Sequence, residues 1–372
     1  MSYALQTLWH ERQRYLPGVL AVAFSALLIA LQCGLLLGLF SITSLPVDKT
    51  DADIWMGAPA VLSVDLGGPI RSDNLFRLQG QPGVERAELY LQGFSYWSKR
   101  DGGRELCMVI GSRLENDALG RVKELTADLR SKLTIPGNIV IDESDMSRLG
   151  IKGIGDTAEV ISTQVRVVGL TKGIRSLAGP YVFCSVTTAQ MLLRLTSDQT
   201  TYVLAKCNKG VDPREVVSRL KKEYNNLSAF TKDEFSLRSR MHWLTKTKAG
   251  IALGYAAALG LLVGAVVTSQ TLRAATLASI KEFAVLRALG IPRWRMSVLV
   301  MSQAFWVGVI GVALAMPTVY GAARLADRLG TAVPLPWWLL VIAAGVTLLM
   351  AIISGLFALR ALKNVEPATL LR

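Results

Sequence analysis

Four apolar segments of this 372-residue chain are long enough to cross a membrane. A transmembrane helix needs about 20 mostly apolar residues to span a hydrocarbon core of about 30 Å. Lipid offers the backbone no hydrogen-bond partners, so a single apolar segment can cross only as a helix. The sequence therefore predicts an α-helical membrane protein with four transmembrane helices, at residues 18–43, 248–272, 297–322 and 337–359.

The first and second spans are separated by residues 44–247, which are numerous enough to form a domain with its own core. The whole chain is 51% hydrophobic and 19% charged, which is typical of membrane segments combined with a soluble domain. Of the net charge of +13, this segment carries only +4. The remainder flanks the spans, where it orients them in the membrane. We therefore expect no nucleic-acid partner.

Strand-like runs of β-branched and aromatic residues alternate with helical patterns inside this domain. The predicted strands are Val84–Trp97, Arg104–Gly111, Asn138–Ile141, Ala158–Ile161, Gln164–Leu170, Tyr181–Ser185 and Tyr202–Cys207. Helices are predicted at 143–149, 187–195 and 213–224. This order favours a large α+β or split-βαβ domain between transmembrane helices 1 and 2.

The short loop at residues 273–296 sets the topology. It contains five Lys or Arg residues and one acid, Glu282. Short loops with this bias stay on the cytoplasmic side. Both termini are then cytoplasmic, and the α+β domain is extracytoplasmic (periplasmic). Residues 1–17 are predicted to form a cytoplasmic amphipathic helix that Pro17 and Gly18 end, and residues 360–372 a cytoplasmic tail.

One cluster of charges disagrees with this topology. Arg238, Arg240, Lys246 and Lys248 lie just before the second span, on the side predicted to be external. The charge bias is counted over short loops, because long domains translocate largely regardless of charge. The 273–296 loop therefore decides the topology.

The same loop has an internal pattern. Its apolar residues recur every three to four positions, which predicts a helix, and Gly290 with Pro292 ends that helix. A short amphipathic helix on the cytoplasmic membrane face is typical of a docking element. The alternative is a helix that merely connects two spans.

The side chains required for several kinds of chemistry are scarce or dispersed. The only histidines, His10 and His242, lie beside predicted membrane boundaries, which disfavours a His-dependent triad or a multi-histidine metal site. No GxxxxGK[ST] phosphate loop occurs. The domain cysteines Cys107, Cys184 and Cys207 lack CxxC spacing, so at most one disulfide could form and buried free thiols are expected.

Three stretches of the sequence resemble one family of membrane proteins. Lys281–Gly290, KEFAVLRALG, is similar to the REIGVLRALGA signature of the FtsX/MacB/LolC type of ABC transporter permease. Val365–Arg372 resembles the closing pattern of that family, and Ile141–Asp156 resembles a segment of its external domain. Within the family, Asp53–Trp55 and the short loop before Pro336 are most like the DevC branch. Lys281 in place of Arg and Phe283-Ala284 in place of Ile-Gly are mild departures.

The resemblance implies a permease subunit of an ABC exporter of the MacB/DevC mechanotransmission type, in the bacterial inner membrane. Two permease chains, as a homodimer, would dock on a separate cytoplasmic ATPase that binds ATP and Mg, so this chain would be non-catalytic and hold no cofactor. Movement of the periplasmic domain would export a lipid, glycolipid, peptide or drug-like cargo. A periplasmic adaptor, an outer-membrane duct and membrane lipid would be the further partners.

The resemblance also assigns residues. Those implied in ATPase coupling are Glu282, Phe283, Leu286, Arg287, Ala288, Leu289 and Gly290, with Glu366 and Pro367 in the C-terminal motif. Glu282 and Arg287 are five residues apart, which is not the spacing of a pair within one helix, so they are expected to contact the ATPase.

Two alternative functions also fit the sequence. One is an FtsX-like signalling assembly, in which the external domain regulates a partner without transporting a substrate. The resemblance implies a much smaller external domain for FtsX itself, so the roughly 200 residues here favour export. The other is a membrane-anchored sensor or enzyme that works without an ATPase. Neighbouring genes for an ATPase and an adaptor would distinguish export from both.

Replacing Leu286 with Asp tests the docking prediction. An unpaired carboxylate buried in an apolar groove costs several kcal/mol, so Leu286→Asp is expected to abolish association with the cognate ATPase or its stimulated turnover. The measurement is co-purification and ATP hydrolysis after co-expression with ATPases from the same genome. The transporter hypothesis would be contradicted if the protein is stable in the membrane but neither the unmodified chain nor Leu286→Asp recruits an ATPase.

Overall fold

The computed structural model describes residue 10 and residues 12–99, 102–174, 179–278, 292–328 and 333–363. Two compact units divide the chain. One comprises Met1–Gly38 with Gly250–Arg372, and the other is Leu39–Ala249.

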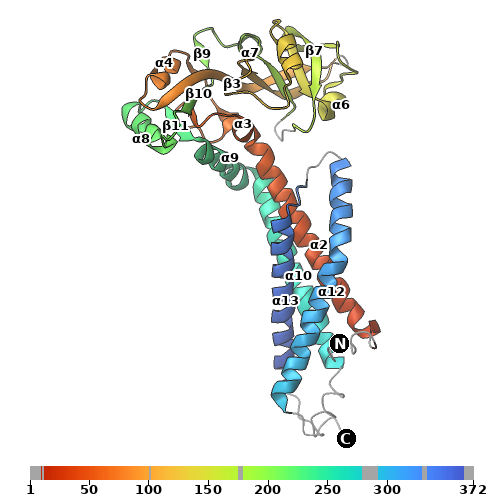
Figure 1. The fold of residues 1–372 in the computed structure, drawn as a ribbon. Helices are drawn as coiled ribbons and strands as arrows, with labels where there is room; N and C mark the ends of the chain where they lie inside the picture. Colours follow the sequence, from red (N-terminus) through yellow and green to blue (C-terminus); the bar gives the residue numbers. More distant parts are fainter. Residues whose placement is uncertain are drawn as a thin grey trace. The chain divides into compact units, whose positions relative to one another are not determined.

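Four long helices form the first unit (Figure 1): α2 (Arg12–Thr43), α10 (Lys248–Ala278), α12 (Arg293–Arg328) and α13 (Trp337–Lys363). Each contains a segment long and apolar enough to cross a membrane: Tyr15–Thr43, Gly250–Thr271, Ser297–Ala326 and Trp337–Leu356. The prediction of four transmembrane helices is confirmed.

The predicted break at Pro17 and Gly18 is wrong. Both residues lie inside α2, which the structure describes as one uninterrupted helix over Arg12–Thr43. Proline removes one backbone donor, and so one intrahelical hydrogen bond. In this position the apolar run that follows decides the outcome, because a membrane segment must satisfy its remaining backbone groups by staying helical.

Small residues allow the membrane helices to approach closely. A Cβ added to Gly311 of α12 would lie 2.6 Å from Val22 Cγ1 of α2, and one added to Gly355 of α13 would lie 2.8 Å from Ala304 Cβ of α12. The Ser25 hydroxyl of α2 lies 3.3 Å from the carbonyl oxygen of Gly264 in α10, a hydrogen bond between helices. Such contacts are the usual means of helix association in lipid, which supplies no hydrophobic driving force between helices.

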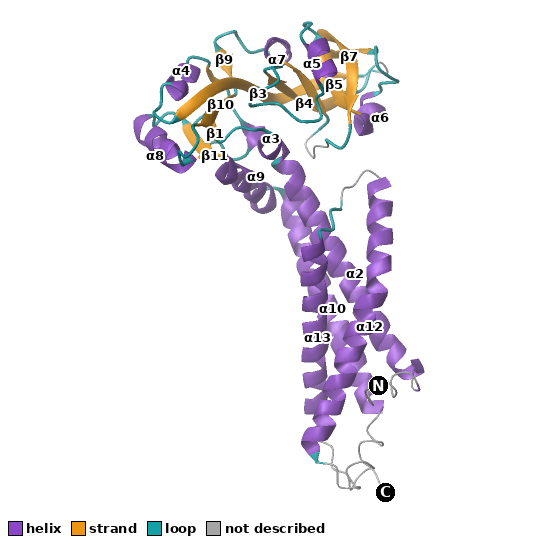
Figure 2. Ribbon diagram, in the orientation of Figure 1, coloured by secondary structure: helices purple, strands orange, loops and turns teal. Residues whose placement is uncertain are grey.

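The second unit is an α+β domain built on a mixed sheet (Figure 2). Among the described residues its nine strands follow the order β11-β1-β10-β3-β4-β8-β5-β7-β6. Their bounds are β1 (Ile54–Gly57), β3 (Val84–Ser98), β4 (Arg104–Ser112), β5 (Asn138–Asp142), β6 (Thr157–Val160), β7 (Thr163–Thr171), β8 (Tyr181–Ser185), β10 (Tyr202–Cys207) and β11 (Ser228–Thr231). A separate pair joins β2 (Ile70–Arg71) to β9 (Gln199–Thr200).

Half of the large sheet closes on itself. The end of β3 pairs with β6 at Trp97↔Val160, so β3, β4, β8, β5, β7 and β6 form a ring around an apolar core. Trp97 is fully buried, and its indole N–H donates to the carbonyl of Leu149 at 3.0 Å. The helical segments of this half are α5 (Ala127–Leu133), η2 (Glu143–Asp145), α6 (Met146–Leu149) and α7 (Val186–Leu193).

The other half, β11-β1-β10-β3, is open and has a core on each face. One face packs against α4 (Asn74–Gln79) and α8 (Pro213–Glu223). The opposite face packs against α3 (Leu45–Lys49), η1 (Val64–Leu66) and α9 (Lys232–Lys246). On that face Trp55 of β1 contacts the rings of Tyr90, Tyr202 and Phe235. These aromatic contacts hold α9 against the sheet.

The strands and helices predicted for the domain are found within two residues of their expected bounds, and the helix predicted at 143–149 is the 3-10 turn η2 followed by α6. The structure adds β1, β2, β9 and β11, and the helices α3, α4, α5 and α9. All four cysteines are free, as expected, and the three in the domain are buried.

Gly111 of β4 provides a test of the packing beneath α7. An alanine Cβ there would lie 2.2 Å from Ala189 Cβ, so Gly111→Ala is expected to destabilise the domain by about 1–3 kcal/mol. Urea unfolding of the full chain in detergent, followed by tryptophan fluorescence, measures the loss. Gly153→Ala is the matched control, because no atom lies within 4 Å of its added Cβ.

The double variant Gly111→Ala/Ala189→Gly should recover part of the stability, because it removes the methyl group in the way. Equal stability of Gly111→Ala and Gly153→Ala would contradict this packing.

Candidate functional site

The α+β domain begins and ends next to membrane spans, so its two chain connections are the places where it can exchange force with the membrane. The chain enters the domain through α3, which directly follows α2 and the first span. It leaves through α9, after which α10 begins at Lys248. The candidate site therefore lies where α3 and α9 meet.

Local sequence sets the ends of both helices. Pro46 lies in the first turn of α3, where its missing N–H costs nothing, and Val47 is fully buried in the core. Thr231 caps α9, because its hydroxyl accepts from the backbone N–H of Glu234 at 3.3 Å. This Thr-x-x-Glu spacing is the sequence pattern of a capping box. Phe235 follows in the first turn, and its ring stacks on that of Phe230 with the two ring centroids 5.0 Å apart.

Asp48 of α3 is the centre of a polar cluster that joins the two helices. Its Oδ2 accepts from the Ser44 hydroxyl at 2.6 Å and from Arg240 Nη2 at 2.7 Å. Its Oδ1 accepts from the Ser236 hydroxyl at 2.7 Å. Arg240 Nε also donates to Ser44 Oγ, at 2.8 Å. We call these four residues, Ser44, Asp48, Ser236 and Arg240, the clasp.

The two serines are buried, whereas the side chains of Asp48 and Arg240 are 35% and 37% exposed. A bond between a carboxylate and a guanidinium is stronger than a neutral hydrogen bond, but partial exposure screens it. The clasp therefore contributes on the order of 1 kcal/mol per charged contact. Its chief effect is geometric, since it joins residues 192 positions apart in the sequence.

Further contacts fix α9 to the domain along its length. The Lys232 ammonium donates to the carbonyl of Thr50 at 2.6 Å, and Arg238 Nε to the carbonyl of Val61 at 2.8 Å. Near the end of α9, the indole N–H of Trp243 donates to Asp65 Oδ1 at 3.2 Å. A movement of α9 would accordingly carry this side of the domain with it.

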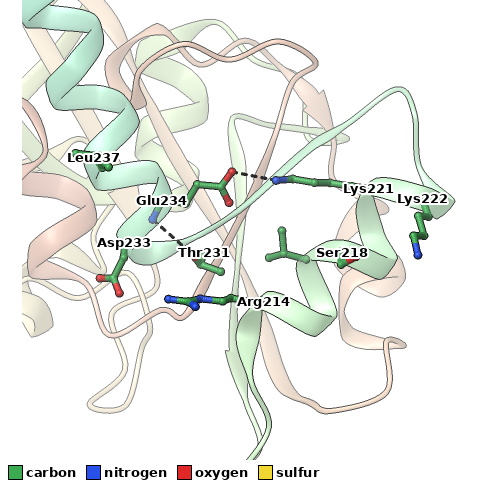
Figure 3. Close-up of a pocket in the computed structure, with 9 residues that line it drawn as sticks. Arg214, Ser218, Lys221, Lys222, Thr231, Asp233, Glu234 and Leu237 are labelled. Carbon is green, nitrogen blue, oxygen red and sulfur yellow. Dashed lines mark hydrogen bonds and ion pairs between the residues drawn. The ribbon is translucent and has the colours of Figure 1, made fainter.

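A groove of about 720 Å³ lies beside the start of α9 (Figure 3). Residues of α8 form one wall, and Thr231 with the first turns of α9 forms the other. Lys221 and Glu234 form an ion pair at 3.0 Å between the two walls. The lining residues are Arg214, Val217, Ser218, Lys221, Lys222, Thr231, Asp233, Glu234 and Leu237. Cations and acids nearly balance, so the groove has no strong charge preference.

The cysteines are unsuited to nucleophilic chemistry. Burial raises the pKa of the Cys107 thiol to about 12 and also raises that of Cys184, so both stay protonated at neutral pH. Within the described parts of the chain, no group of three or more His, Cys, Asp or Glu side chains could hold a metal ion.

The residues predicted for ATPase coupling, Glu282, Phe283, Leu286, Arg287, Ala288, Leu289 and Gly290, lie outside the described residues, as do Glu366 and Pro367. Their roles stay predictions. Sequence reasoning missed the clasp, although Arg240 stood out as a misplaced cation. The Thr231-x-x-Glu234 pattern is the signal that could have revealed α9.

Comparisons with known proteins agree with this architecture. The family model described as the MacB-like periplasmic core domain matches residues 19–223, more than half of the chain. The model described as the FtsX-like permease C-terminal region matches residues 254–367. A comparison with curated proteins gave no match.

Among solved structures, the periplasmic region of MacB from Actinobacillus actinomycetemcomitans is similar, with 12% identity, a TM-score of 0.35, and coverage of 50% of this chain and 92% of that one. The extracellular domain of the ABC-type transporter YknZ from Gram-positive bacteria has 10% identity, a TM-score of 0.33, and coverage of 48% and 99%. On the two family matches, which follow one another along the sequence, this chain belongs to the family of FtsX-like and MacB-like ABC transporter permeases.

Proposed function

We propose that this chain is the permease subunit of an exporter that works by mechanotransmission, the mechanism that its resemblance to the MacB/DevC type implies. In this proposal two copies of the chain dock on a separate cytoplasmic ATPase. Nucleotide binding shifts the membrane helices, the helices move the α+β domain, and the domain pushes its cargo into a periplasmic adaptor and an outer-membrane duct. The termini are cytoplasmic and the chain lies in the inner membrane.

The clasp is the observation that carries this proposal. A domain that is pushed and pulled through two connections responds as one body only if those connections are joined. Asp48 and Arg240 join them directly, through a charge-assisted hydrogen bond of 2.7 Å between α3 and α9. The Ser236 hydroxyl, which donates to the same carboxylate at 2.7 Å, adds a second contact between the same two helices.

The membrane helices support a mechanical role over a conducting one. The central parts of the four spans contain no Asp, Glu, Lys or Arg, whereas ion-coupled transporters place ionisable residues inside the membrane. Close packing through Gly311 and Gly355 suits helices that transmit displacement to one another. The energy for movement would then come from the ATPase, through the coupling segment predicted at Glu282–Gly290.

The charge reversal Arg240→Glu tests the role of the clasp. It places a second carboxylate beside Asp48, and like charges in contact repel. We expect ATP hydrolysis by the assembled complex to continue, while the nucleotide-dependent movement of the domain is largely lost. The movement is measured in nanodiscs as energy transfer between a fluorophore on Ile135→Cys and labelled lipid, with Cys33 replaced by Ala.

The double variant Asp48→Lys/Arg240→Glu should restore much of the movement, because it reverses both charges. Arg214→Glu is the control for a charge reversal elsewhere in the domain, since Arg214 is exposed and lies outside the clasp. Full movement in Arg240→Glu would show that the clasp does not transmit it. No nucleotide-dependent movement in the unmodified, ATP-hydrolysing complex would contradict mechanotransmission itself.

An exporter and a signalling assembly would both move the domain, but they predict different experimental results. An exporter should deplete an amphiphilic cargo from the donor membrane in an ATP-dependent way that fails in Arg240→Glu. A signalling assembly should instead change the activity of an external partner with no flux of cargo. Flux from reconstituted vesicles loaded with the lipids and glycolipids of the source cell distinguishes the two.

A further inference from the structure

The residues that lead out of the α+β domain have an unusual charge. From Phe235 to Gly250 the chain contains four Lys or Arg residues and no acid. With the domain external, these cations lie on the side of the membrane that short basic loops avoid. The clasp accounts for Arg240, and Arg238 donates to the carbonyl of Val61, but the positions of Lys246 and Lys248 have no such explanation.

The exposed face of α9 is apolar at the same place. One face of α9 is buried against the domain through Phe235 and Ser239. The other face exposes Leu237 and Met241, four residues apart, with 60% and 45% of their surfaces accessible. Leu244, half-buried, continues this row by one more turn. Residues at this spacing share one side of a helix, so α9 has an apolar strip that its own domain leaves largely exposed.

Chain length places the end of α9 next to the membrane. The helix ends at Lys246, and the candidate span begins at Gly250. Four residues, even fully extended, reach at most about 14 Å. The ammonium groups of Lys246 and Lys248 therefore fall within or beside the layer of lipid headgroups. Both side chains are exposed, and in the described part of the chain neither forms an ion pair.

We propose that the exposed face of α9, together with Lys246 and Lys248, binds anionic phospholipid headgroups of the adjacent leaflet. An apolar strip flanked by cations is the pattern of a helix that lies in a membrane interface. Basic residues next to a span attract anionic lipid within a Debye length of the surface. The occupant is lipid because the chain enters a candidate membrane span only four residues after α9 ends, and because the charge excess has the sign that anionic headgroups require.

This inference concerns the chain itself and holds whether or not an ATPase drives it. Its consequence for the proposed function is regulatory. Because α9 also contributes Ser236 and Arg240 to the clasp, anionic lipid bound to α9 would hold one half of the clasp at the membrane surface. Lipid composition would then set how freely the domain moves.

The test uses the full chain in nanodiscs of phosphatidylcholine, with and without phosphatidylglycerol. A nitroxide is attached at Met241→Cys in a chain whose Cys33 is replaced by Ala, since the other cysteines are buried. Phosphatidylglycerol is expected to shield this nitroxide from a water-soluble relaxation agent and to increase its contact with oxygen, which concentrates in lipid. A nitroxide at Ile135→Cys, also exposed but on a loop far along the chain, should not respond.

The charge contribution is tested with Lys246→Gln/Lys248→Gln. Loss of the two cations should raise the fraction of phosphatidylglycerol needed for shielding, with binding weakened roughly thirty-fold. Lys123→Gln/Lys152→Gln is the matched control, because it removes two exposed cations elsewhere in the domain and should leave the response unchanged.

Three results would overturn the proposal. The first is equal accessibility of the Met241 nitroxide in both lipids. The second is an unchanged response in Lys246→Gln/Lys248→Gln. The third is shielding from both reagents in either lipid, which would indicate that a protein surface, such as a second copy of the chain, covers this face.

Discussion

A domain inserted between two consecutive membrane spans must begin and end at the same membrane surface. The bilayer imposes this, because each span can satisfy its backbone only as a continuous helix that crosses completely. The first and second spans of this permease enclose such a domain, and its two connections are α3 and α9. The clasp centred on Asp48 joins these two connections, because Ser236 and Arg240 of α9 donate hydrogen bonds to Asp48 of α3. It therefore binds the beginning of the domain to its end.

The clasp in turn depends on the aromatic core behind it. Phe235 of α9 lies against Trp55, Tyr202 and Phe230, and this burial positions Ser236 and Arg240 on the adjacent face of the same helix. Burial of aromatic side chains supplies most of the energy, and the polar contacts select one geometry. The ion pair is modest, and it joins two helices that already share one apolar core through Val47 and Phe235.

Much of the domain could be read from the sequence, and the exceptions have a common cause. Strands β3 and β4 are 15 and nine residues long, so the apolar residues within them are numerous enough to give a strand pattern. The strand β1 is only four residues long and wholly buried, so it shows no alternation. Helix α9 buries Ser236 and Ser239, and a search for apolar periodicity overlooks serines that are buried because they hydrogen-bond. The helix break expected at Pro17 was wrong for a different reason. The local tendency of proline to end a helix was outweighed by the apolar run that follows, which stays helical.

The four spans, the position of the α+β domain between the first two, and the family follow from the order of residues alone, because hydrophobic length and short motifs are properties of contiguous residues. The contact of Asp48 with Arg240, the return of β3 to pair with β6, and the exposure of the apolar strip of α9 are visible only in the folded chain. These features join residues that are far apart in the chain, and their energies depend on burial and geometry that no local pattern encodes.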